Sequence, residues 1–297
     1  MRMRIFVAIM FIIVIACIIT YFLIPSPLKI SGRVNLVTST NGAYRTLTRQ
    51  EVWDTLSRGN FSITKKLVNT VELDVKNENF HFPVSLVLIP LSKDSVTVSW
   101  SGEFPEVLNP LSKIRQYGLA ASVSEKMNTA LKKFQAFVRE NENVYGFHIE
   151  ETSTKDTFLI AFRFKSLTYP PDELIYSYIK KLQTFAKAAG VSQTSPPMLN
   201  VSTIDSTLFN NMVAIPISGK VEGTDSISFI RMVPGRFLTA EIKGGPHTIH
   251  NAHKTMIQYF IDFNRISMAI PFDYLVTDRL LEKDTTKWIT RVYNPVY

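Results

Sequence analysis

The stretch RFLTAEIKGGPHTIHNAHKTMIQYFIDFNR, residues 236–265, carries the pattern that decides the fold of the C-terminal half. Residues 236–243 are typical of a strand, and Gly-Gly-Pro at 244–246 is a turn signal. From His247 to about Arg265, apolar residues recur at helical spacing: Ile249, Met256, Tyr259, Phe260 and Phe263. The stretch therefore predicts a strand, a turn and an amphipathic helix in succession.

The same succession occurs about 80 residues earlier, which indicates an internal repeat. Residues 157–166 alternate as a strand with four apolar residues on one face: Phe158, Ile160, Phe162 and Phe164. Pro170 and Pro171 open a predicted helix that ends at Gly190. A polar loop and two further strands, residues 209–219 and 226–233, complete this first copy of the repeat.

In the second copy, the two closing strands are predicted at residues 272–277 and 287–296. Two copies of a strand–helix–strand–strand unit predict a pseudo-two-fold α+β domain. We expect two sheets and two helices that enclose a groove, which is a usual place for a small-molecule site. This domain is predicted to span residues 146–297.

Residues 28–145 predict a second α+β domain, an antiparallel sheet with a long C-terminal helix. Residues 82–90 and 95–101 are strand-like, and a short helix is predicted around Glu51–Leu56. The long helix is predicted over residues 111–140, with one apolar stripe: Val123, Met127, Ala130, Leu131, Phe134 and Val138.

The N-terminal segment, residues 1–27, contains the apolar run Ile5–Ile24. A helix of that length spans about 30 Å, so the run predicts a transmembrane helix. Arg2 and Arg4 favour a single-pass inner-membrane protein with its N-terminus in the cytoplasm and periplasmic domains. Two alternatives are a cleaved signal peptide and a lipoprotein signal, since Val14–Cys17 resembles a lipobox.

Composition narrows the function classes. The chain has 297 residues, a net charge of +8 and one cysteine. One cysteine excludes a disulfide framework and a cysteine-based zinc site. The excess charge is scattered and forms no basic block, so we expect no nucleic-acid partner.

Several segments of the second half resemble the GyrI-like, or effector-binding, domain family. The C-terminal stretch WITRVYNPV, residues 288–296, resembles the family's Trp-x-Thr-x-x-Tyr-x-Pro-Val signature most closely. Residues 214–217, 243–247 and 271–274 resemble its apolar-Pro-Val strand, its Gly-Pro-Tyr turn and its Pro-x-Glu-x-Tyr segment. The first half is more loosely similar to a reduced SRPBCC (START-related) domain, on residues 43–45, Trp53, residues 98–102 and the long helix.

The GyrI-like resemblance implies binding of a lipophilic, often cationic ligand by aromatic rings and a buried carboxylate. Asp273 stands at the family's acidic position, with a side chain one methylene shorter than Glu. The candidate ligand-binding residues are Asp273, Trp288, Tyr293, Tyr259, Phe162, Phe164 and Met212. Each also has a plain structural interpretation, as core packing for the rings and Met212 and as a turn carboxylate for Asp273.

Catalytic and metal motifs are scarce. No G-x-S-x-G, P-loop or G-x-G-x-x-G motif occurs, and no cofactor is expected. His247, His250 and His253 follow an H-x-x-H-x-x-H pattern, which we interpret as a solvated helix start without a metal. Two functions remain: a membrane-anchored ligand sensor or sequestering module, and a hydrolase or cyclase acting on a small organic substrate in the same groove.

Overall fold

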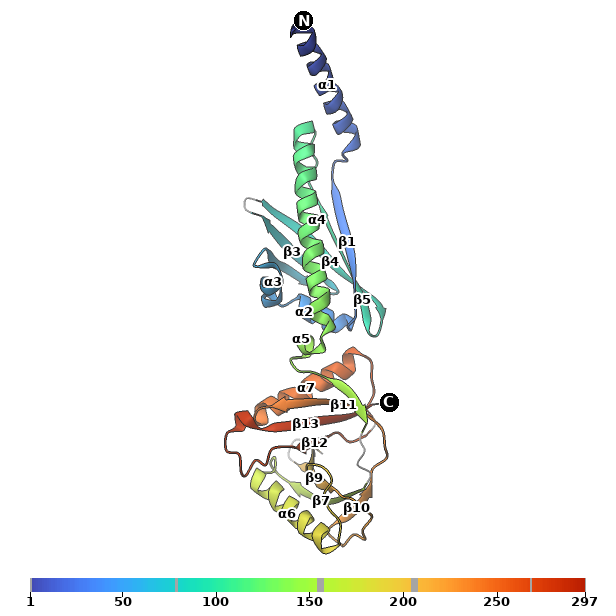
Figure 1. Ribbon diagram of the computed structural model, residues 1–297, viewed down its shortest axis with the longest axis vertical. Helices are drawn as coiled ribbons and strands as arrows, with labels where there is room; N and C mark the ends of the chain where they lie inside the picture. The colour runs from blue at the N-terminus through green and yellow to red at the C-terminus, as the bar shows by residue number, and fades with distance from the viewer. Residues whose placement is uncertain (1, 78–79, 154–157, 204–207, 268, 297) are drawn as a thin grey trace. The chain divides into compact units, whose positions relative to one another are not determined.

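The computed structural model describes residues 2–77, 80–153, 158–203, 208–267 and 269–296, except for the side chains of residues 2–4, 7, 8, 17, 20 and 77. The side chain of Cys17, which belongs to the possible lipobox, is therefore not described. Thr157, at the start of a predicted strand, also lies outside the described residues. The chain divides into two compact units, residues 1–144 and 145–297 (Figure 1). Each unit combines helices with one antiparallel sheet, so the predicted α+β class is confirmed.

The predicted membrane anchor is wrong. A helix, α1 (Arg2–Leu23), does form over the apolar run. Among the described residues, however, no helix is both long enough and apolar enough to cross a membrane. The predicted membrane contact through Ile5–Ile24 and the predicted inner-membrane localisation are withdrawn with it.

The N-terminal unit is built on one five-stranded sheet with the order β1-β5-β4-β3-β2. Its strands are β1 (Lys29–Leu36), β2 (Phe61–Leu67), β3 (Thr70–Asn77), β4 (Phe80–Ser92) and β5 (Ser95–Glu103). Its other helices are α2 (Thr40–Leu47), α3 (Gln50–Ser57), α4 (Pro110–Arg139) and α5 (Asn141–Tyr145), of which α5 ends in the next unit.

The long helix α4 begins where the sequence predicts. Asn109 caps it by accepting a hydrogen bond from the Leu111 amide at 2.9 Å, and Pro110 occupies the first turn. All six residues of the predicted apolar stripe are buried in a core shared with the sheet. Trp53, on α3, is fully buried and stacks on Phe134 with ring centroids 5.9 Å apart. Packing of a helix stripe on one sheet face therefore stabilises this unit.

The C-terminal unit is built on one eight-stranded sheet with the order β10-β7-β9-β8-β12-β13-β11-β6. Its strands are β6 (Glu150–Ser153), β7 (Phe158–Ser166), β8 (Met198–Thr203), β9 (Phe209–Pro216), β10 (Ser228–Arg231), β11 (Arg236–Lys243), β12 (Phe272–Leu275) and β13 (Ile289–Val296). Its helices are α6 (Asp172–Ala188) and α7 (Pro246–Asp262), with the short 3-10 turn η1 (Thr285–Lys287) before β13.

The strand order shows the duplication, with two differences from the prediction. β7-β9-β8 mirrors β11-β13-β12, and β8 pairs with β12 where the copies meet. The two predicted sheets are thus one continuous sheet. The first copy uses β8, in a segment predicted to be a polar loop, whereas β10 is an added edge strand. Burial of Met198, Leu199 and Asn200 explains β8, because a strand buried on both faces does not alternate.

Both helices of the duplicated unit cover the same face of its sheet. Leu275 on β12 is buried in the cluster that packs under α6. Asp273, two residues earlier on the same strand, contacts His253 of α7. Residues i and i+2 of a strand point to one face, so α6 and α7 share that face. The opposite face holds a separate cluster that includes Phe272 and Tyr274.

Candidate functional site

Asp273 lies on the helix-covered face of the central strand β12, opposite Leu199 of β8 and Val292 of β13. The residue is 8% exposed. Its Oδ2 atom lies 3.1 Å from Nε2 of His253, whereas its Oδ1 atom is buried without a hydrogen-bond partner among the described residues. An unsatisfied buried carboxylate oxygen is costly, typically by about 1–3 kcal/mol or more. It marks a place where a hydrogen-bond donor is missing.

His253 supplies the partner that Asp273 needs from the second helix of the unit. Burial by itself would lower the pKa of His253, but the hydrogen bond and the negative charge of Asp273 raise it, and the net shift is upward from 6.5. The imidazole therefore holds its proton to higher pH than a free histidine. Aspartate and histidine form a polar pair between β12 and α7.

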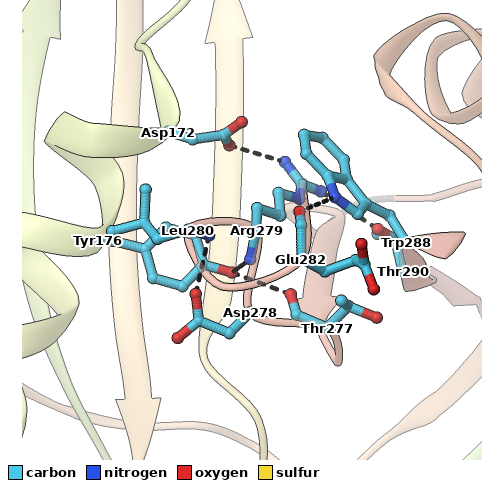
Figure 2. Close-up of polar contacts among 9 residues, drawn as sticks. All are labelled: Asp172, Tyr176, Thr277, Asp278, Arg279, Leu280, Glu282, Trp288 and Thr290. Atoms are coloured by element: carbon cyan, nitrogen blue, oxygen red, sulfur yellow. Dashed lines mark hydrogen bonds and ion pairs between the residues drawn. The ribbon is translucent and has the colours of Figure 1, made fainter. Parts of the chain in front are cut away.

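Arg279 is a buried cation between α6 and β13 (Figure 2). Its side chain is only 4% exposed. Nη1 lies 3.2 Å from Oδ1 of Asp172, the first residue of α6, and Nη2 donates to Oγ1 of Thr290 at 3.1 Å. The guanidinium carbon stands 4.9 Å from the centroid of the Trp288 ring. The cation is thus satisfied by an acid, a hydroxyl and an aromatic face.

The segment that carries Arg279 is tied to α6 and to itself. The Tyr176 hydroxyl accepts the Arg279 amide at 3.0 Å and donates to the Thr277 carbonyl at 3.0 Å (Figure 2). The Trp288 indole donates to the Glu282 carbonyl at 2.9 Å. These bonds hold the backbone so that the guanidinium points inward and covers the indole.

The Asp273 pair and the Arg279 cluster belong to one region. Thr290, which binds Arg279, is the register partner of Leu275 and lies diagonally across from Asp273, about 7–8 Å away on the same face. Tyr169 interacts electrostatically with both groups. Desolvation raises the pKa of its hydroxyl; the charge of Arg279 lowers this pKa, and the charges of Asp273 and Asp172 raise it. We refer to Asp172, His253, Asp273, Arg279, Trp288 and Thr290 as the polar cluster.

The structure brings together only part of the predicted site. Asp273 and Trp288 belong to the polar cluster. Phe162 and Phe164 share its sheet face but pack on Tyr178 of α6, at centroid distances of 4.2 and 4.7 Å.

The other three predicted residues lie elsewhere in the unit. Tyr293 stacks on Phe272 at 5.0 Å, and both it and Met212 pack on the face opposite the helices. The absence of a bulge between Trp288 and Tyr293 in the regular β12–β13 and β11–β13 pairing explains this, since an odd offset reverses the face. Tyr259 on α7 meets the rings of Tyr145 and Phe263.

Sequence reasoning missed His253 and Arg279 as members of the cluster. His253 belongs to the histidine run, which predicts a solvated helix start. In the structure, its side chain instead extends from α7 to Asp273 on β12. Arg279 lies in the irregular segment between β12 and β13, where no periodicity predicts the direction in which a side chain points. No group of three or more metal-ligating residues occurs in the described parts of the chain.

A separate surface hollow lies beside the C-terminal end of α7. It is lined mainly by apolar residues, including Ile257, Ile261 and Ile266, together with Arg265 and Asn294. It shares no residue with the polar cluster.

Comparisons with known proteins identify similar folds only. No protein-family model and no curated protein sequence matches the chain. The crystal structure of the EcmrR C-terminal domain is 17% identical, covering 51% of this chain and 98% of its own, with a TM-score of 0.43.

Two further solved structures are similar. SAV2435 bound to tetraphenylphosphonium is 11% identical over 50% of this chain and 94% of its own, with a TM-score of 0.36. A START superfamily protein from Mycobacterium smegmatis is 13% identical over 37% of this chain and 98% of its own, with a TM-score of 0.29. At these identities and scores, the chain is similar to these proteins in part of its fold and is assigned to no family.

Proposed function

We propose that the C-terminal unit binds a small lipophilic molecule at the polar cluster, as a ligand sensor or sequestering module. The observation that carries this proposal is the buried, unpaired Oδ1 atom of Asp273. A buried polar group without a partner is retained at a cost in stability, and such costs concentrate at functional sites. A ligand that donates a hydrogen bond to Oδ1 would remove the cost.

The surroundings of Asp273 suit a largely apolar guest. Leu199, Leu275 and Val292 are buried neighbours on the same sheet face, and Trp288 is 6% exposed. Ligand sites typically combine such apolar walls with a few placed polar groups. Asp273 is itself 8% exposed, so a guest that reaches it is held away from solvent.

Direct binding measurements test the proposal. Calorimetric titration of the full chain with diphenylmethanol and with tetraphenylphosphonium should detect binding of at least one of the two. Asp273→Ala should weaken that binding about tenfold or more, because the anchor is removed. Glu241→Ala, a half-exposed carboxylate on the opposite sheet face, is the matched control and should change nothing. Equal affinities in wild type and Asp273→Ala contradict the role of Asp273.

A second candidate function is a hydrolase or cyclase acting on a small organic substrate. The hydrogen bond between Asp273 and His253 favours it, since a carboxylate that orients an imidazole is a common acid–base arrangement. Turnover of activated esters or epoxides by the full chain, abolished by both Asp273→Asn and His253→Gln, would support this candidate. Turnover unaffected by both substitutions would exclude the pair as its source.

A further inference from the structure

Arg279 occupies the position that an aromatic site offers to a cationic guest. Its guanidinium carbon lies 4.9 Å from the Trp288 ring centroid, and its side chain is almost fully buried. Cations are attracted to the face of an indole within about 6 Å. That face is already used by a cation that belongs to the chain itself.

Each acid of the polar cluster already lies against a basic side chain. Asp172 lies 3.2 Å from Arg279, and Asp273 lies 3.1 Å from His253, whose pKa is raised by that carboxylate. A guest cation would add an uncompensated positive charge beside Arg279 in a desolvated place. Such a charge is unfavourable because burial removes its hydration, and no free opposite charge is left in the cluster to compensate for that loss.

One requirement remains open in the cluster, and it is a hydrogen bond rather than a charge. Oδ1 of Asp273 is buried without a partner among the described residues. A neutral hydroxyl or N–H group meets this need without adding a charge, whereas a quaternary cation has no proton to donate.

We infer that Arg279 sets the charge class of the ligand: the site takes a neutral lipophilic molecule with a hydrogen-bond donor and rejects lipophilic cations. This inference rests on the binding function proposed above. Arg279 acts as a specificity-determining residue, since it covers the indole and supplies the positive charge. The guest's donor group is placed at Asp273, and its apolar part at the neighbouring aliphatic side chains and the edge of the indole.

Three probes of one shape test the inference by calorimetric titration of the full chain. Diphenylmethanol is neutral and donates, its methyl ether is neutral and does not donate, and diphenylmethyltrimethylammonium is a cation without a donor. The wild type should bind diphenylmethanol about tenfold more tightly than the ether, because an unpaired buried acceptor is costly. It should discriminate against the cation by at least the same factor.

Variants of Arg279 separate charge from packing. Arg279→Met keeps the length and removes the charge, so the affinity for the cation should rise about tenfold as the indole face becomes available. Arg279→Lys keeps the charge and should keep the discrimination. Arg291→Met is the matched control, because Arg291 forms an exposed pair with Glu241 on the opposite sheet face.

The outcomes are distinct. Preference for diphenylmethanol in the wild type, reduced about tenfold relative to the cation by Arg279→Met only, supports the inference. Tighter or equal binding of the cation by the wild type overturns it and leaves the binding function intact. Binding of none of the probes overturns both. If Arg279→Met does not fold, the order of the three probes on the wild type decides the question by itself.

Discussion

The two units pack helices on antiparallel sheets, but they treat buried polar atoms differently. In the N-terminal unit the buried tryptophans are satisfied: Trp53 donates to the Leu47 carbonyl at 2.8 Å and Trp100 to Oδ1 of Asn128 at 3.3 Å. Among the described residues, five buried side-chain polar atoms lack a partner, and four of them lie in the C-terminal unit. The N-terminal unit therefore satisfies nearly all of its buried side-chain polar atoms, whereas the C-terminal unit leaves more of them unsatisfied, Oδ1 of Asp273 among them.

The largest expected effect concerns the satisfied core. Trp53→Ala should reduce the free energy of unfolding of the N-terminal unit by about 3–5 kcal/mol, since it removes a fully buried ring stacked on Phe134. Urea denaturation followed by circular dichroism measures this loss. Val68→Ala, at a 90% exposed position in the same unit, should change little. Equal losses from both substitutions would break the comparison.

A smaller effect is expected at the buried ion pair of the C-terminal unit. Asp172→Ala leaves the Arg279 guanidinium, 4% exposed, without its acid and should cost about 2 kcal/mol, reduced from a fully buried pair because Asp172 is 27% exposed. Glu173→Ala controls for the helix dipole, because both acids lie in the first turn of α6. Thermal unfolding should show a clear difference between the two variants, and matching curves would assign the effect to the dipole.

The sharpest contrast is expected at Asp273, where stability and binding should separate. Asp273→Asn removes a buried charge that lacks a full set of partners, so its free energy of unfolding should change by less than about 1 kcal/mol. The same substitution should weaken binding of diphenylmethanol. A loss of stability as large as that of Trp53→Ala would instead identify Asp273 as a structural residue.

The smallest effect is a pH dependence of the His253–Asp273 pair. Because the folded-state pKa of His253 is raised above 6.5, the pair stabilises the native state fully below that pH and loses the effect as pH rises through the raised pKa. Proton NMR titration of the His253 ring measures the pKa directly. Asp273→Asn should shift it downward, and an unchanged titration would show that Asp273 is not the cause.

Local pattern was enough for most helices and strands. The stripe of α4 and the turn before α7 are local features, and each was predicted within a few residues. The predicted membrane span is not supported, because no helix among the described residues is long and apolar enough to cross a membrane. β8 was missed because a strand inside a sheet does not show the alternation that marks a half-exposed one.

Residues of the candidate site could be predicted only where a single strand determines the direction of the side chain. Asp273 and Trp288 are predicted from their motifs; Asp273 lies on the helix-covered sheet face, and Trp288 contacts Arg279, which binds Thr290 of that face. Met212, which was expected to line the groove, packs on the face opposite the helices, because the side to which a strand residue points depends on the register of pairing. For Tyr293, the odd offset from Trp288 already predicts opposite faces, and the regular pairing keeps them. The chain gave no local signal for Arg279, which turns inward from an irregular segment.

The amino-acid sequence alone determined the α+β class, the repeated strand–helix–strand–strand unit and the position of a candidate acid, because periodicity and turn chemistry are encoded within a few neighbouring residues. Only the tertiary structure decided that the two copies share one sheet, that His253 meets Asp273, and that Arg279 covers Trp288. These contacts join residues far apart in the chain, and their geometry follows from long-range packing that no short pattern specifies.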